Sequence, residues 1–268
     1  MKPQLPDSFA RTGCSRRNLP NHFQMAALLV LSCLLLPALI GCTRDPKVKA
    51  EKHYARAEKL LKENNPDAAI IELRSAIQLN PKLAKARFEL GNVELQRGTP
   101  QIAFQEFVAT VKADPKHHQA QVMIGEMLAR AGTFTEAESQ AQLILSKWPD
   151  DKIATLLLAE SSFGLQDYKQ AQSLVDQVLA TDPNDTRALS DLAYLQLQDK
   201  KVEQAEATLR RAWQLDPKST GAVSSLSSIY EMKGDLPNAE AVLKQAQQQN
   251  DGQTVSYTHL TLPTKRIV

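Results

Sequence analysis

The stretch AIIELRSAIQLNPKLAKARFELGNVELQRG, residues 69–98, places an Asn-Pro step between two segments rich in Ala, Leu, Ile and Glu. Proline then recurs every 34 residues along the chain, at Pro81, Pro115, Pro149, Pro183 and Pro217. A fixed period of this length indicates a stacked structural repeat. Because proline pushes the preceding residue out of the helical region, we expect each of these prolines to end a helix.

Six repeat units follow when Ala50 is taken as position 1: residues 50–83, 84–117, 118–151, 152–185, 186–219 and 220–254. Position 20 is alanine in every unit, and position 8 is Ala, Gly or Ser. Small side chains at these two positions allow the two helices of a hairpin to approach closely. We expect helix A of each unit at positions 2–14 and helix B at positions 18–31.

This pattern resembles the tetratricopeptide repeat over residues 50–254. The resemblance implies an all-α fold, a right-handed α-solenoid of about six helix-turn-helix units. The hairpin turn is expected at position 15, which is occupied by Gly98, Gly132, Gly234, Asn64, Gln166 and Lys200. The other all-helical possibility, a long coiled coil, would need an apolar period of about seven residues, which the chain does not follow.

The N-terminal segment has the layout of an export signal. The apolar run MAALLVLSCLLLPALIG, residues 25–41, follows basic residues and precedes a polar, charged segment. As a helix the run would span about 25 Å, which is short for a bilayer core, and Pro37 weakens such a helix. We therefore predict a lipoprotein-type signal peptide at residues 1–41, with a permanent membrane anchor as the alternative. Met25 is a second possible start, and Arg16-Arg17 leaves twin-arginine export open.

The run ends in Leu39-Ile40-Gly41-Cys42, which resembles the lipobox of bacterial lipoproteins. The resemblance implies that Cys42 carries the lipid and that residues 42–49 form a lipidated linker. Several acyl chains anchor a protein stably in a membrane. The chain is therefore predicted to be lipid-anchored in the cell envelope and to face the periplasm. Thr43, in place of aspartate, favours the outer over the inner membrane by the same resemblance.

Composition excludes several classes of function for the repeat body. Without residues 1–41 and 255–268 the chain is mildly acidic, which disfavours nucleic acid as a partner. The three cysteines all precede the repeats, and no CxxC spacing or nucleotide-binding motif occurs. His117 and His118 are interpreted as a solvated loop. We expect no catalytic residues, no metal site, no cofactor and no small-molecule substrate.

Helix A lines the inner groove in proteins of the resembled family, mainly through positions 2, 5, 9, 12 and 13. The resemblance implies that this groove binds proteins or peptides, and its apolar and aromatic side chains suit an amphipathic segment. Packing between neighbouring hairpins is the other interpretation for some of them. The candidate groove residues are Tyr54, Phe88, Asn92, Leu95, Val122, Leu156, Phe163, Tyr194 and Leu197.

The last segment, VSYTHLTLPTKRIV at residues 255–268, does not continue the repeat. It resembles the translation of a transposase-type sequencing adapter, and we expect an artefactual, disordered tail and a natural protein that continues beyond it.

The stretch at residues 69–98 resembles the large tetratricopeptide lipoproteins of exopolysaccharide and PEP-CTERM sorting systems. The predicted function is a membrane-tethered scaffold for protein–protein interaction in the bacterial cell envelope. The alternatives are a lipoprotein of type IV pilus assembly and the repeat region of a truncated enzyme.

Overall fold

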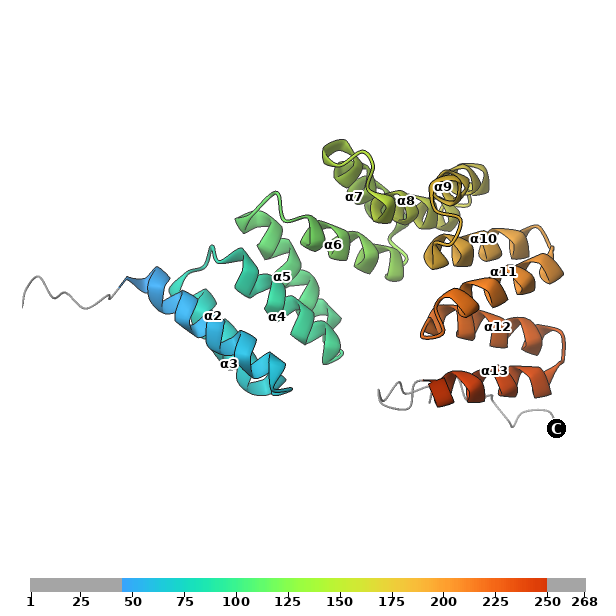
Figure 1. Ribbon diagram of the computed structural model, residues 1–268. Coiled ribbons are helices and arrows are strands. Elements are labelled where there is room, and N and C mark those ends of the chain that lie inside the picture. The colour runs from blue at the N-terminus through green and yellow to red at the C-terminus, as the bar shows by residue number, and fades with distance from the viewer. Residues whose placement is uncertain (1–44, 250–268) are drawn as a thin grey trace, which may run out of the picture. The chain divides into compact units, whose positions relative to one another are not determined.

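The computed structural model describes residues 45–249, and within them every regular element is a helix (Figure 1). Contacts between residues divide the chain into two units, with the boundary between Lys49 and Ala50. The helices are α2 (Pro46–Lys62), α3 (Pro66–Leu79), α4 (Ala84–Gln96), α5 (Pro100–Ala113), α6 (His118–Arg130), α7 (Phe134–Lys147), α8 (Lys152–Gly164), α9 (Tyr168–Thr181), α10 (Thr186–Gln198), α11 (Val202–Leu215), α12 (Thr220–Met232) and α13 (Leu236–Gln249).

The twelve helices of the described part form adjacent antiparallel pairs, α2 with α3 through α12 with α13. This arrangement confirms the predicted fold class, an all-α chain of about six helix-turn-helix units. In the repeat numbering helix B occupies positions 17–30 in every unit and helix A positions 1–13 in units two to six, one residue earlier than expected, whereas α2 begins before the first unit, at Pro46. Side-chain caps account for the earlier start of α8 and α10, because Asp151 and Asp185 accept hydrogen bonds from the third residue beyond them.

Each hairpin turn contains one residue with a positive φ, at the position that the sequence predicts. The six residues are Asn64, Gly98, Gly132, Gln166, Lys200 and Gly234, with φ between 56° and 75°. Glycine adopts this left-handed conformation without steric cost, whereas an L side chain does not. Asparagine tolerates it better than other L residues, so Gln166 and Lys200 are the two turn residues that fit their backbone poorly.

We expect Lys200→Gly to raise the free energy of unfolding by about 0.5–1 kcal/mol, because glycine relieves the strain at φ 60°. Urea unfolding followed by circular dichroism measures the change. Gln177→Gly, at an exposed position inside α9, is the matched control and should cost about 1 kcal/mol. If Lys200→Gly lowered the free energy of unfolding as much as Gln177→Gly does, this explanation would be wrong.

Small side chains set the distance between the helices of each pair. The position-20 alanines are all buried: Ala69, Ala103, Ala137, Ala171, Ala205 and Ala239. At position 8, a Cβ on Gly91 would lie 2.6 Å from Phe107 Cε1, and one on Gly125 would lie 2.3 Å from Leu157 Cδ2. The neighbouring large side chains thus fill the space that the small residues leave, as close packing requires.

Successive hairpins stack mainly through helix B of one unit and helix A of the next, and in the middle of the array α6 also contacts α8 and α8 contacts α10. This stacking places one face of α6, α8 and α10 side by side, and it positions the candidate site described below. Among residues 45–249 no helix is both long and apolar enough to cross a membrane. The predicted signal peptide, Cys42 and the segment at 255–268 lie outside the described residues.

Candidate functional site

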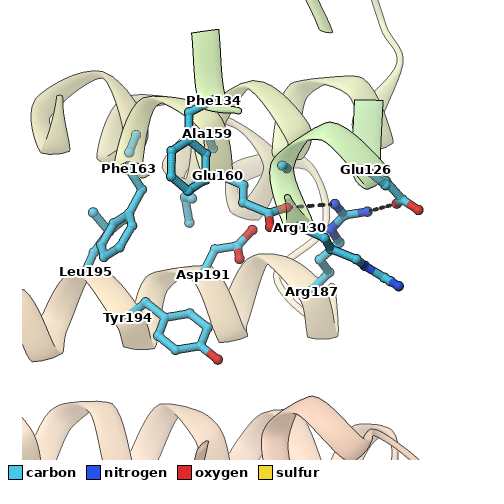
Figure 2. Close-up of a pocket in the computed structure, with 13 residues that line it drawn as sticks. Glu126, Arg130, Phe134, Ala159, Glu160, Phe163, Arg187, Asp191, Tyr194 and Leu195 are labelled. Carbon is cyan, nitrogen blue, oxygen red and sulfur yellow. Dashed lines mark hydrogen bonds and ion pairs between the residues drawn. The ribbon is translucent and has the colours of Figure 1, made fainter. Parts of the chain in front are cut away.

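A cavity of about 460 Å³ opens among the A helices of three consecutive units. It is lined by side chains of α6, α8 and α10, with Phe134 from the start of α7 and Ala171 and Val175 from α9. Its polar groups are three carboxylates and two guanidinium groups (Figure 2). Cavities of this size commonly hold small ligands or side chains.

Arg187 connects the three A helices that line the cavity. Its Nη1 donates to Glu126 Oε1 at 2.6 Å, and its Nη2 donates to Glu160 Oε2 at 3.3 Å. Burial opposes the charge of Arg187, but Glu126, Asp191 and Glu160 outweigh it and raise the pKa of this guanidinium. Arg187 is therefore a fixed cation whose charge is already balanced within the site.

Asp191 is the carboxylate of the cavity that lacks a donor. Its Oδ2 atom is buried and has no hydrogen-bond partner among the described residues. Figure 2 shows this carboxylate pointing toward that of Glu160. Burial raises the pKa of Asp191 from its usual 3.8 to about 7; Arg187 opposes the rise, and Glu160 and Asp185 add to it. A buried acceptor without a donor costs about 1–3 kcal/mol, so this group destabilises the empty site.

Aromatic and aliphatic side chains form the other wall of the cavity. Phe163 lies beside Leu195 in Figure 2, and its ring packs edge-on against Tyr168 with the centroids 5.3 Å apart. Tyr194 is 45% exposed, and its hydroxyl is 2.9 Å from Ser225 Oγ. The site thus combines an apolar wall with an acidic one.

A second, more apolar cavity of about 650 Å³ adjoins the first through Arg130, which lines both. Leu95, Phe104, Met127 and Leu128 contribute its apolar surface, from α4, α5 and α6. Arg130 is exposed and has no ion-pair partner among residues 45–249. The two neighbouring cavities can therefore take different kinds of side chain, one apolar and one polar.

Phe163 and Tyr194 are the predicted groove residues that the structure brings together in the first cavity, and Leu95 lines the second. Tyr54, Phe88 and Asn92 are half-buried and lie in the first two hairpins. Lys85 Nζ lies over the Tyr54 ring, 4.4 Å from its centroid. Burial, and after it the nearby charge of Glu58, raises the pKa of the Tyr54 hydroxyl. Phe88 packs between the rings of Phe107 and His117.

Three predicted groove residues instead fill the space between hairpins, which is the alternative that the sequence left open. Leu156 is only 2% exposed and packs with Val178 and Ala188. Val122 is 7% exposed within the core of the third and fourth hairpins. Leu197 is half-buried against the last core cluster. A partner cannot reach Leu156, because its side chain lies between helix B of its own hairpin and helix A of the next one.

Sequence reasoning missed Arg187 and Asp191, two of the five charged residues that line the first cavity. A signal for Asp191 exists, because it occupies position 6, where the third and fourth units have Met123 and Leu157. An acid at a position that neighbouring repeats fill with apolar side chains indicates a local polar role.

The interpretation of the two histidines as a solvated loop is wrong. His117 Nδ1 caps α6 by accepting a hydrogen bond from Ala120 N at 3.2 Å. His118 begins α6, pairs with the carboxylate of Asp151 and packs edge-on against Trp148. The acidic partner is the N-cap residue of α8, 33 residues along the chain, so a search at helical spacing could not find it. Among the described residues no group of three His, Cys, Asp or Glu side chains could hold a metal ion.

Comparison with protein families supports the architecture. Two models described as tetratricopeptide repeat match the chain, one at residues 54–109 and 101–152 and the other at 128–193, 162–226 and 196–258. The chain is a tetratricopeptide repeat protein. Its repeats belong to a class of typically non-catalytic scaffolds that bind protein or peptide partners. The search among curated proteins found no match to the sequence.

Several solved structures share the fold at low sequence identity. PilW, a type IV pilus biogenesis factor, is 16% identical, with a TM-score of 0.58 over 79% of this chain and 98% of that one. PilF of Pseudomonas aeruginosa is 16% identical, with a TM-score of 0.54 over 80% and 97%. YrrB, described as having an unusual peptide-binding site, is 19% identical, with a TM-score of 0.52 over 65% and 89%.

Proposed function

We propose that this tetratricopeptide repeat protein is a non-catalytic scaffold, tethered by a lipid on Cys42 to a membrane of the bacterial cell envelope. In this proposal it faces the periplasm, from the outer membrane, and holds a protein partner along its A helices. The observation that carries the proposal is the pair of adjoining cavities, which side chains of α4, α6, α8 and α10 line together with side chains of neighbouring B helices. The lipobox-like Leu39–Cys42 supports the membrane tether.

Cys42→Ala should release the protein from membranes, because the lipid supplies the anchor. Fractionation of cells that express the wild type or the variant measures the release, and labelled palmitate reports the lipid directly. We expect label only in the wild type. Cys33→Ala, inside the apolar run, is the matched control and should leave both the label and the membrane fraction unchanged. A wild type that never takes up palmitate would refute the lipoprotein assignment.

The groove is tested with a photo-cross-linking amino acid in place of Tyr194. We expect a discrete adduct in cells, because Tyr194 is exposed and lines the first cavity. The same replacement at Ile71, which is 67% exposed on α3 and lines neither cavity, is the control and should give no such adduct. The adduct at Tyr194 should disappear when Phe163→Glu places a charge in the apolar wall. Identical adducts from both positions would argue against a partner in the groove.

The cellular process that we propose is exopolysaccharide export or protein sorting, because residues 69–98 resemble the lipoproteins of those systems. A role in type IV pilus assembly is the second candidate, since PilW and PilF are covered almost completely by this chain. Deletion of the gene separates the two. Loss of secreted polysaccharide with normal twitching motility supports the first, and the reverse result supports the second.

A further inference from the structure

The first cavity has an excess of negative charge at the place where its polar groups meet. Arg187 forms ion pairs with both Glu126 and Glu160. Asp191 is a third carboxylate in the same cavity, beside a cation whose charge these two glutamates already balance. The other cation of the lining, Arg130, extends away from the facing carboxylates of Asp191 and Glu160 (Figure 2). The buried Oδ2 of Asp191, which has no donor among the described residues, is thus an acceptor that a ligand could satisfy.

The apolar wall restricts which cation fits. Beside Asp191 the cavity is lined by Phe163, Leu195 and Tyr194, which suit a methylene chain better than a hydrated ion. The described part of the chain holds no three side chains that could bind a metal ion, which disfavours a divalent cation. The cavity matches an aliphatic stem that ends in a compact cationic group.

We infer that this cavity binds a lysine or arginine side chain of the partner, with Asp191 and Glu160 accepting hydrogen bonds from its cationic end. The inference rests on the proposed peptide-binding function of the groove and specifies its ligand. Carboxylates continue along the A helices, because Glu58, Glu126 and Glu160 occupy position 9 in three of the six units. A basic partner segment therefore meets complementary charge along the array.

Pools of labelled decapeptides with one fixed central residue provide the probe. The full-length protein, in detergent at pH 8, is titrated into pools that carry Lys, Arg, Glu or norleucine at the centre, and fluorescence polarisation gives the affinity. Norleucine has a similar aliphatic stem without the charge, so it isolates the cationic contact. We expect the Lys or Arg pool to bind at least tenfold more tightly than the norleucine pool.

Asp191→Asn should reduce the Lys-pool affinity to that of the norleucine pool and leave the norleucine affinity within twofold. Glu160→Gln should weaken the same preference less, because Arg187 already engages Glu160. The matched control is Asp176→Asn on the exposed surface of α9, where the carboxylate accepts from Gln172. This control should bind every peptide pool with the affinity of the wild type. Circular dichroism verifies that every variant keeps its helix content.

The preference should also depend on pH, because a protonated Asp191 offers less charge to a cation. The charged groups around Asp191 are Arg187 and Asp185 from α10 and its cap, Glu160 from α8, and Glu126 and Arg130 from α6. We expect the Lys-pool affinity to fall at least threefold between pH 8 and pH 5.5 while the norleucine pool changes little. If Asp191 served only in packing, the affinities of the Lys and norleucine pools would change with pH in parallel.

The outcomes separate this inference from the proposed function. Equal binding of the Lys, Arg and norleucine pools overturns the cationic site but leaves a peptide-binding groove. A preference that survives in Asp191→Asn, or tighter binding of the Glu pool, also overturns it. Failure of every pool to bind overturns both the cationic site and the groove.

Discussion

Phe107→Ala lowers the free energy of unfolding by about 3–5 kcal/mol, the range expected for truncation of a fully buried phenylalanine. The Phe107 side chain is 0% exposed and is the largest fully buried side chain of the described residues. Its ring packs against Phe88, with the centroids 5.6 Å apart, and it occupies the space opposite Gly91. Alanine would leave a cavity that rigid helices can close only in part.

Urea unfolding followed by circular dichroism measures this loss, and amide hydrogen exchange locates it. Each hairpin contacts mainly its neighbours, so we expect faster exchange in α4, α5 and α6 than in α10–α13. Phe104→Ala is the matched control, because Phe104 lies on the same helix but is half-buried beside the second cavity. It should cost about 1–2 kcal/mol. Equal losses in the two variants would show that Phe107 does not hold this junction together.

Asp191→Asn stabilises the protein at pH 8, by about 1–3 kcal/mol. Burial, the largest cause, raises the pKa of Asp191 from 3.8 to about 7, so the folded protein binds this proton more tightly than the unfolded chain. The wild type therefore loses stability as the pH rises from about 4 to about 7, and the full penalty is present above that range. Such a pKa difference corresponds to about 4 kcal/mol, which partial access of water to the side chain reduces.

Unfolding curves at pH 4, 6 and 8 test this expectation, because asparagine does not ionise. The stability gain of the variant should be near zero at pH 4 and largest at pH 8. Asp176→Asn, on the exposed face of α9, should show no such trend. A gain that is independent of pH, or a loss at pH 8, would mean that Asp191 is not held in an unfavourable ionised state. If the gain accompanies lost binding of cationic peptides, the protein gives up stability at this residue for recognition.

The repeat could be read from the chain because its determinants are local. The residues that end helices, cap them and allow the left-handed turn act within a few positions of one another, as Pro81, Asp151 and Gly132 show. The sequence placed all six turns at the observed positions and, except for the start of α2, missed the helix ends by one residue. The ends of a helix are its least sharply defined residues, so a shift of this size leaves the pattern unchanged.

The candidate groove was predicted less well, because a helix position specifies a direction and not a neighbour. Positions 2, 5, 9, 12 and 13 supplied the candidates, yet Leu156 at position 5 is buried while Phe88, at the same position of the second unit, is half-buried. The difference depends on which side chains of the neighbouring hairpins cover the position, which the position within one unit does not specify.

By itself the sequence determined the period, the hairpin turns, the buried small residues and the absence of a nucleotide-binding motif. Only the tertiary structure decided which charges meet. Arg187 contacts Glu126 and Glu160, which lie 61 and 27 residues earlier in the chain, and Asp191 is left without a donor beside them. The physical reason is range: helix and turn propensities act over a few residues, whereas these contacts exist only after three hairpins have stacked.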